Sequence, residues 1–383
     1  MKKLFFAAIF CLLLFASLFV YVFLIDSSEG EFLEVFVGID VAYSDVEGIK
    51  ALVNETSSYT NTIVIGSTGI TYDVAKLNDV CDYVYNKSMY FMIYMHPQLE
   101  LDKLEEQRQW VQDARTQWGQ NFLGLYTYDE TGGRQLDNAT YRVLNEEPAN
   151  YTDAEEKYTT WLNENLAHIR GEPIDAGNLT LFTSDYALYW FDYEGGYDCV
   201  FAEFGWNYSR QLNVALCRGA ATVQNKEWGV MVTWTYNNPP YLESGEELYE
   251  DLILAYKNGA KYILVFDTNK NYTAGVLEEE HLDALKQFWD YTQNNPRKAE
   301  APSKRVAYVL PKGYAYGFRG PADKIWGFWE GADDPLSYGI NVDVSNLLDE
   351  YKTKLDIIYD EEKALDATYS KYIFWNGTVI SGS

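Results

Sequence analysis

Two acidic residues directly follow a run with the alternation of a buried strand. The stretch Phe122–Tyr128 (FLGLYTY) precedes Asp129 and Glu130, and two glycines come next. Because successive side chains of a strand point to opposite faces, Leu123 and Leu125 fall on one face, and the tyrosines fall on the other with Glu130. If the leucine face packs on helices, Glu130 points into the mouth of the structure that the strand helps to build. An acidic turn that merely ends a strand is the alternative.

Four other predicted strands end on an ionisable residue whose side chain can point, like that of Glu130, toward a common central axis. These are Asp40 (in phase with Phe36 and Gly38), His96 (with Met92 and Tyr94), Glu203 (with Cys199 and Phe201) and Asp267 (with Ile263 and Val265). Two carboxyl groups that flank one bond are the minimum equipment for glycoside hydrolysis. We predict Glu130 and Glu203 as this catalytic pair. Glu130 is the expected acid, because adjacent tyrosines would desolvate it and raise its pKa.

The remaining candidates suit the binding of a sugar. The chain has 33 tyrosines and 11 tryptophans, whose flat apolar rings with polar edges favour carbohydrate. Structural alternatives exist: Glu203 could cap a helix near Asn207, Asp267 could start a turn, His96 could bond a loop carbonyl, and Trp234 could be core. The predicted substrate-binding residues are Asp40, His96, Asp129 and Asp267 for hydroxyl groups, and Trp190, Trp206, Trp234 and Tyr236 as stacking platforms.

Strand-like and helix-like segments alternate from Val35 onward, as in α/β domains with parallel strands. Eight strands in about 260 residues match a (β/α)8 TIM barrel. The rival, a doubly wound sheet, would need a glycine-rich phosphate loop, and Gly38–Asp45 (GIDVAYSD) is not one. The predicted strands are Val35–Asp40, Thr62–Gly66, Tyr90–Met95, Phe122–Tyr128, Leu179–Ser184, Cys199–Phe204, Val230–Thr235 and Tyr262–Phe266. The predicted helices are 45–54, 73–85, 99–117, 153–169 (with a capping box of Thr152 and Glu155), 209–224, 245–258 and 278–293.

Three parts of the chain are predicted. Residues 1–31 form an anchor and linker, 32–296 the barrel, and 297–383 a small Rossmann-like α/β appendage after the linker Asn294–Ser303. The appendage is predicted to hold three strands (Arg305–Leu310, Leu355–Tyr359 and Tyr372–Trp375) and a helix near Val344–Tyr351. It is too small to be expected to stand alone, so we expect it to dock on the barrel.

The N-terminus predicts a location outside the cytoplasm. Lys2 and Lys3 precede Leu4–Ile25, a stretch without charge that is long enough to span a bilayer. This order of charges predicts a signal anchor with its C-terminal side outside the cell; a cleaved signal peptide is the alternative. Glycosylation sequons support an exterior location. They lie at Asn54, Asn86, Asn138, Asn150, Asn178, Asn207, Asn271 and Asn376.

Charge and cysteine content exclude several classes of function. The formal charge of −27 argues against nucleic acid or an anionic membrane surface as a partner, because both require cationic patches. Cys81, Cys199 and Cys217 cannot all pair within one chain, so one disulfide or buried free thiols are expected. They also lack the spacing of a zinc site, and we predict neither a metal nor a cofactor.

Two motifs carry a resemblance to a known group. With LGLYTYDE (residues 123–130) and FAEFGW (residues 201–206), the barrel resembles a clan of (β/α)8 glycoside hydrolases. The resemblance maps a glutamate after strand four onto Glu130. Such families usually carry their second carboxylate after strand seven, where this chain has no acid before Glu243; families that pair strands four and six normally use two aspartates. The appendage resembles Rossmann-like domains of β-galactosidase-like enzymes, and the exterior chain resembles archaeal membrane-anchored surface proteins.

The sequence therefore predicts an anchored, extracellular (β/α)8 glycosidase that acts on a carbohydrate. Two alternatives share the fold: a non-catalytic polysaccharide-binding protein, and a structural component of the cell envelope. A further alternative is metal-assisted hydrolysis, with Asp40, His96, Glu130 and Asp267 as ligands.

Overall fold

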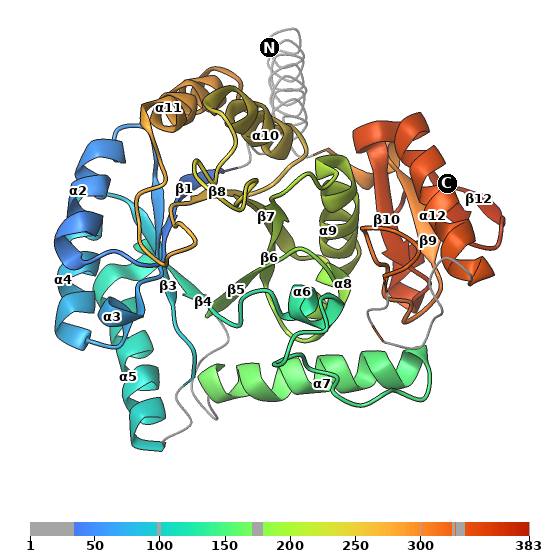
Figure 1. Cartoon of the computed structure of the whole chain (residues 1–383), viewed down its shortest axis with the longest axis horizontal. Coiled ribbons are helices and arrows are strands. Elements are labelled where there is room, and N and C mark those ends of the chain that lie inside the picture. The colour runs from blue at the N-terminus through green and yellow to red at the C-terminus, as the bar shows by residue number, and fades with distance from the viewer. Residues whose placement is uncertain are drawn as a thin grey trace, which may run out of the picture.

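Eight parallel strands close into a barrel, and a separate small sheet follows it in the chain (Figure 1). The computed structural model describes residues 34–97, 101–170, 179–298, 300–323, 326 and 334–382. Each barrel strand pairs with its neighbours in sequence order, and β8 pairs with β1. The barrel strands are β1 (Phe36–Val41), β2 (Thr62–Ile65), β3 (Tyr90–Tyr94), β4 (Phe122–Tyr126), β5 (Thr180–Asp185), β6 (Cys199–Phe204), β7 (Glu227–Val232) and β8 (Tyr262–Phe266).

The predicted (β/α)8 barrel is confirmed, with all eight strands in their expected places. The largest shift is in β7, which lies three residues before its predicted start at Val230. The short aromatic crossover between β5 and β6 holds a single short helix, α8. The helices of the barrel are α2 (Val46–Thr56), α3 (Thr68–Thr71), α4 (Val74–Asn86), α5 (Leu101–Trp118), α6 (Thr131–Leu136), α7 (Tyr151–Arg170), α8 (Tyr189–Glu194), α9 (Arg210–Gln224), α10 (Gly245–Lys257) and α11 (Glu279–Asn294).

Helix starts follow the local sequence. Ser244 caps α10, where its side chain and that of Glu247 form a capping box. The capping box predicted at Thr152 and Glu155 is wrong. Helix α7 begins two residues earlier than predicted, and the Asn150 side chain accepts a hydrogen bond from the Asp153 N–H (3.0 Å).

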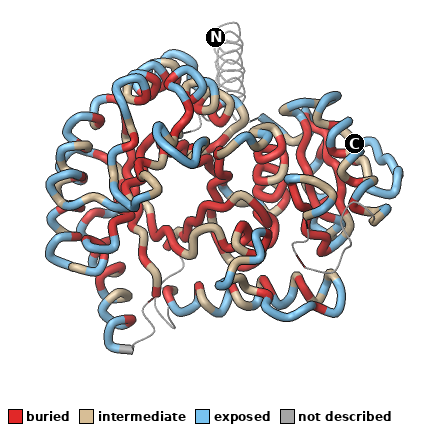
Figure 2. The backbone as a smooth tube through the Cα atoms, viewed as in Figure 1, coloured by how far each residue is buried: buried red, intermediate tan, exposed pale blue. Residues whose placement is uncertain are grey.

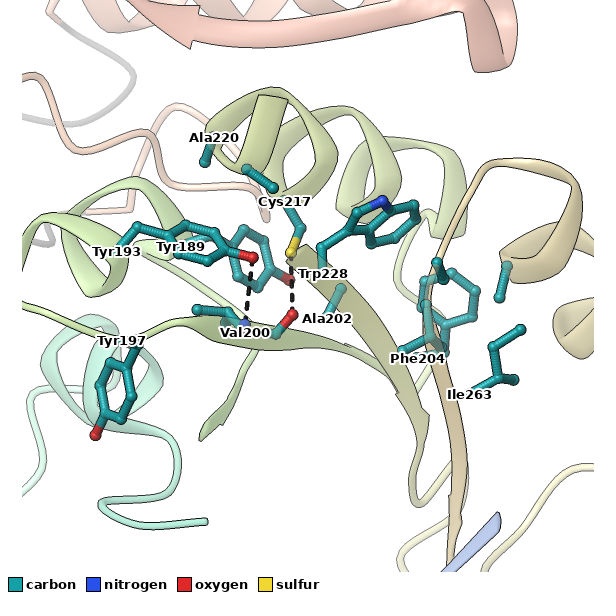
Figure 3. Packing of buried hydrophobic residues seen from close by; sticks show 14 of the residues in the cluster. Tyr189, Tyr193, Tyr197, Val200, Ala202, Phe204, Cys217, Ala220, Trp228 and Ile263 are labelled. Atoms are coloured by element: carbon teal, nitrogen blue, oxygen red, sulfur yellow. Dashed lines mark hydrogen bonds between the residues drawn. The ribbon is translucent and has the colours of Figure 1, made fainter. Parts of the chain in front are cut away.

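The barrel strands alternate between an inner and an outer core. In β6, Val200, Ala202 and Phe204 point outward and pack under α9, beside Cys217 (Figure 3). Cys199 and Phe201 belong to the separate core inside the barrel. Burial is therefore densest along the strands, and exposed residues lie on the outer helices (Figure 2). This alternation aims the next inward residue, Glu203, along the barrel axis.

Strand β4 departs from the predicted alternation. Leu125 packs outward as expected, but Leu123 packs against the inner core. Gly124 has φ +145°, and the pairing with β3 shifts register beside it. A Cβ at this glycine would lie 2.1 Å from the Thr180 carbonyl oxygen. This irregularity turns Leu123 to the inner face, so its prediction was wrong.

The appendage is larger than predicted. Its sheet has four strands, in the order β10-β9-β11-β12, because the chain returns antiparallel after β11. Its helix also begins earlier than expected, with Asp334 as the cap. The elements are β9 (Val306–Leu310), α12 (Pro335–Tyr351), β10 (Leu355–Tyr359), β11 (Lys371–Phe374) and β12 (Val379–Ser381).

The appendage docks on α9 of the barrel through a buried ion-pair network (Figure 1). Arg218 of α9 donates to Asp356 (2.8 Å) and to the Thr353 carbonyl (2.7 Å). Arg305 and Tyr369 bind the other carboxylate oxygen of Asp356, which is fully buried. Because removal of one partner would leave a buried charge unpaired, this contact holds the two parts in one arrangement.

Several sequence predictions concern the surface and the termini. No helix in the described part of the chain is long and apolar enough to cross a membrane; the predicted anchor, Leu4–Ile25, lies outside that part, as does Asn178. The other seven sequon asparagines are exposed. The three described cysteines are buried free thiols.

Candidate functional site

Glu203 lies at the C-terminal end of β6, inside the barrel. Its side chain is buried, and its Oε1 lies 2.6 Å from the Ser184 hydroxyl at the end of β5. The Asn213 amide of α9 approaches its main-chain carbonyl (3.4 Å). Helix α9 is capped by Ser209, so the alternative of Glu203 as a helix cap is wrong.

Ser184 joins Glu203 to a second carboxyl group, that of Asp129. The Ser184 Oγ lies 2.9 Å from Asp129 Oδ1, and the Tyr126 hydroxyl donates to the same oxygen at 2.5 Å. Since Ser184 Oγ is 2.6 Å from Glu203 Oε1 and 2.9 Å from Asp129 Oδ1, these carboxyl oxygens are at most about 5.5 Å apart. Retaining glycosidases hold their two carboxyl groups about 5–5.5 Å apart, and inverting ones about 6.5–9.5 Å. The pair that the structure joins is therefore Asp129 and Glu203.

Burial and mutual repulsion set the protonation of Glu203. Burial raises the pKa of Glu203 well above its ordinary value, and the charges of Glu130 and Asp129 raise it further. The Ser184 hydrogen bond opposes this rise but is a smaller effect. A carboxyl group that stays protonated at neutral pH can act as a general acid.

Glu130 lies beside this pair, in a strained turn. Its φ is +53°, and its main-chain N–H donates to the Ser184 carbonyl (2.9 Å). Burial raises its pKa to about 8, with further contributions from Asp129 and Asp185. The sequence prediction placed a raised pKa here and attributed it to adjacent tyrosines; burial and two aspartates are the causes. Its catalytic role stays a prediction.

Asp185 fixes the loop that carries Asp129 and Glu130. Its two carboxylate oxygens accept the N–H groups of Gly132 (2.5 Å) and Gly133 (2.8 Å). A Cβ on Gly133 would lie 2.1 Å from the Tyr186 ring, so only glycine permits this close approach of the β4 and β5 loops. The two glycines that follow the acidic pair thus position the carboxyl groups.

Asp40 lies at the end of β1 and faces the barrel interior, as predicted. It is buried, and its Oδ1 has no hydrogen-bond partner in the described part of the chain. Burial raises its pKa well above the ordinary value, and Asp129 and Asp267 raise it further.

His96 also lies at the rim, where aromatic rings enclose it. Its Nε2 is 2.5 Å from the Tyr94 hydroxyl, and its ring packs against Tyr128. Burial lowers its pKa, which Asp129 partly opposes. The half-buried imidazole is therefore held neutral, with a fixed orientation toward the site.

Asp267 was predicted to face the barrel interior, and this prediction is wrong. Tyr262 and Leu264 supply the inner face of β8, while Ile263 and Val265 pack outward. Asp267 Oδ1 accepts hydrogen bonds from three consecutive N–H groups, those of residues 275–277. The side chain therefore holds the far end of the loop after β8, at residues 275–277, and not the turn that directly follows Asp267. The two faces of an apolar strand have no polarity difference, so the sequence could not settle their phase.

The four predicted aromatic platforms differ in how far they are exposed to solvent. Trp206 and Trp234 are half-buried at the rim, and the Lys270 ammonium lies over both rings (5.6 and 5.9 Å). Tyr236 is exposed in the loop after β7. Trp190 is buried in α8, where its ring packs on Tyr359 of the appendage. Trp190 therefore cannot stack on a sugar, and that prediction was wrong.

Backbone strain gathers around the barrel mouth. Residues with side chains rarely adopt positive φ, and such strain clusters at functional sites. The loops after the last five barrel strands each hold at least one non-glycine residue in this conformation: Tyr128, Glu130, Leu188, Trp206, Tyr241 and Tyr272.

A loop of the appendage borders the same loops of the barrel. Phe318 packs edge-on against Tyr208, which follows β6, and lies near Tyr186. Arg319 forms an ion pair with Asp137 (2.6 Å), which also accepts a hydrogen bond from the Tyr186 hydroxyl. The appendage therefore braces the β5 loop against which Gly133 packs.

The structure does not gather the four residues of the metal-site alternative. Among the described residues, Glu155, Glu194 and Glu361 form the one group of three or more His, Cys, Asp or Glu residues whose ligand atoms all lie within 4.8 Å of one another. These three glutamates lie between α7, α8 and the appendage, and Lys312 pairs with Glu361 (3.0 Å). Asp40, His96, Glu130 and Asp267 are not in this group, so the geometry does not support them as metal ligands.

Similar solved structures share the barrel. A GH5_18 protein from Streptomyces cattleya, solved with GlcNAc, has 10% sequence identity and a TM-score of 0.56; the match covers 91% of this chain and 100% of that one. The endo-1,4-β-mannanase from Rhizomucor miehei has 8% identity, covers 69% and 96%, and has a TM-score of 0.46. No protein-family model and no curated protein sequence match the chain. The shared property is the fold.

The sequence missed the residue that connects the two carboxyl groups. Ser184 ends a predicted strand and is in phase with Phe182 of the inner core. A serine hydroxyl does not ionise near neutral pH, so Ser184 does not belong to the pattern of ionisable residues at strand ends. A search for any polar strand-end residue with inward phase would have found it.

Proposed function

We propose that this chain is a glycoside hydrolase that cleaves glycosidic bonds with Glu203 and Asp129. The observation that carries the proposal is the Ser184 hydroxyl, which contacts both carboxyl groups and limits their separation. The spacing favours a retaining reaction. Glu203, whose pKa burial raises, protonates the leaving oxygen. Asp129, which accepts two hydrogen bonds, attacks the anomeric carbon.

The surrounding residues support a carbohydrate ligand. His96 lies half-buried at the rim, and Trp206 and Trp234 offer partly exposed rings there. Aromatic faces and a few fixed polar groups are the usual makeup of such sites. Glu130 remains an alternative acid, because burial raises its pKa to about 8.

The test is an assay with soluble polysaccharides, in which hydrolysis is measured by the release of reducing ends. We expect Glu203→Gln and Asp129→Asn each to lower kcat by about 10²–10⁴-fold, and the first product to retain its anomeric configuration by NMR. Glu147→Gln, at an exposed position, is the control. If Glu130→Gln abolishes activity while Asp129→Asn does not, Glu130 replaces Asp129 in the pair. Sugar binding without turnover in the unsubstituted protein would favour the non-catalytic alternative.

We further propose that the barrel lies outside the cytoplasm, anchored through Leu4–Ile25 and glycosylated. The charge-free stretch in the sequence and the exposure of seven sequon asparagines support this. Mass spectrometry of peptides from the native protein tests it. Unmodified asparagines at all these positions would contradict the glycoprotein proposal.

A further inference from the structure

Ser184 occupies an unusual place, because three oxygen atoms lie within hydrogen-bond distance of its hydroxyl. Glu203 Oε1 is 2.6 Å away, the Tyr126 hydroxyl 2.8 Å and Asp129 Oδ1 2.9 Å. Tyr126 also donates to Asp129 Oδ1. Four oxygen atoms thus form one connected cluster between the ends of β4, β5 and β6.

Counting hydrogen atoms restricts the charge of this cluster. Ser184 and Tyr126 bring one hydroxyl hydrogen each. If both carboxyl groups were ionised, Ser184 could donate to only one of them, and the other oxygen would face a lone pair at short distance. One additional hydrogen, held by a carboxyl group, gives each of the three contacts to a carboxyl oxygen a donor.

The additional hydrogen belongs on Glu203. Asp129 Oδ1 can accept from both Tyr126 and Ser184, so both of its short contacts have a donor without a hydrogen of its own. Glu203 is the more buried of the two, and among the described residues Ser184 is the hydrogen-bond partner of its side chain. With the hydrogen on Glu203, each short contact to a carboxyl oxygen has a donor: Glu203 donates to Ser184, Ser184 to Asp129, and Tyr126 to Asp129. The titratable groups whose charges act on Glu203 are Asp129, Glu130 and Asp185, with Tyr126 and Tyr189 also beside it.

We propose that Ser184 is a positioning residue that makes the two carboxyl groups share one proton, and that its hydroxyl donates to whichever of them is charged. The inference rests on the proposed function, because it assigns the states of the acid and the nucleophile. In the first step, the Glu203 hydrogen moves to the leaving oxygen while an Asp129 oxygen bonds to the anomeric carbon and the glycosidic bond breaks. The Ser184 hydroxyl then turns from the new ester toward the Glu203 carboxylate. In the second step, water attacks the anomeric carbon, Glu203 takes its proton, the bond to Asp129 breaks, and Ser184 turns back.

The pH dependence of kcat/KM tests this role. Ser184→Ala removes the acceptor of protonated Glu203 and a donor to charged Asp129. We therefore expect at least one limb of the bell-shaped profile to move, with a loss of about 10- to 100-fold at its maximum. Tyr126→Phe removes a donor to Asp129 and a contact with Ser184, but it leaves the Ser184 hydroxyl between the two carboxyl groups, so the loss at the maximum should be smaller than in Ser184→Ala. Ser184→Thr should restore much of the rate, because it keeps the hydroxyl.

The neighbouring Thr183 offers a matched control. It is equally buried, and its hydroxyl contacts main-chain carbonyls, including that of Tyr128 (3.2 Å). Thr183→Val should leave the shape of the pH profile unchanged. If Ser184→Ala has the profile of the unsubstituted protein, the bridging role is overturned.

Infrared spectroscopy of the full-length protein tests the shared proton without a substrate. Buried carboxyl groups such as Glu130 and Asp40 also contribute protonated-carboxyl bands near neutral pH. We expect one such band to be lost in Glu203→Gln and shifted in Ser184→Ala, while the others stay. If the band is unchanged in Glu203→Gln, Glu203 is not the protonated group and the inference fails. If the band behaves as expected but no polysaccharide is cleaved, the shared proton stands and the proposed function fails.

Discussion

Replacing Glu130 with glutamine should make the protein more stable at alkaline pH. The carboxyl group is half-buried beside Asp129 and Asp185, and its pKa rises from 4.5 to about 8. The folded state therefore holds a proton that the unfolded state releases between these pH values. The contribution of Glu130 to the free energy of unfolding is therefore greatest below about pH 4.5, and it falls as the pH rises to about 8.

The size of this effect follows from the change in pKa. Each pKa unit corresponds to about 1.4 kcal/mol. Without solvent screening, Glu130 would therefore lower the free energy of unfolding by roughly 5 kcal/mol above pH 8. Solvent at the partly exposed carboxyl group reduces this effect, and we expect Glu130→Gln to gain about 2–4 kcal/mol at pH 9. Near pH 4 the two proteins should differ by less than about 1 kcal/mol.

Urea denaturation from pH 4 to 9, followed by tryptophan fluorescence, measures the difference. Glu147→Gln, at an exposed position, controls for the substitution itself. A Glu130→Gln variant that is less stable than the unsubstituted protein at every pH would refute the reasoning. The carboxylate would then be charged and favourably partnered in the folded state.

Two further substitutions test the packing that supports the site. Asp356→Asn leaves two buried arginines without their shared counter-charge, and should cost about 3–5 kcal/mol in urea denaturation; Glu227→Gln, in a partly exposed pair, should cost less than about 1 kcal/mol. An equal effect of both would contradict the docking role of Asp356. Gly133→Ala places a Cβ 2.1 Å from an aromatic ring, and should lower stability by about 1–3 kcal/mol and disturb the acidic loop. Gly69→Ala, where a Cβ meets nothing within 4 Å, is its control, and equal losses would argue against this close packing.

The sequence by itself determined the architecture. Apolar strand segments and amphipathic helices alternate eight times, and this local periodicity predicts parallel strands joined by helices. Glu203, Asp40 and His96 follow strands of regular alternation, so their inward direction was also predictable. The acidic pair Asp129–Glu130 was recognised because it interrupts an apolar run.

Only the tertiary structure decided which groups meet. The bulge at Gly124 and the positive φ at Tyr128 and Glu130 break the alternation on which a sequence prediction depends. Strand β8 is apolar on both faces, so the phase of Asp267 followed from packing alone. The Ser184 contact joins residues from three strands that are 55 and 19 positions apart. Such distances depend on barrel closure, which local sequence does not encode.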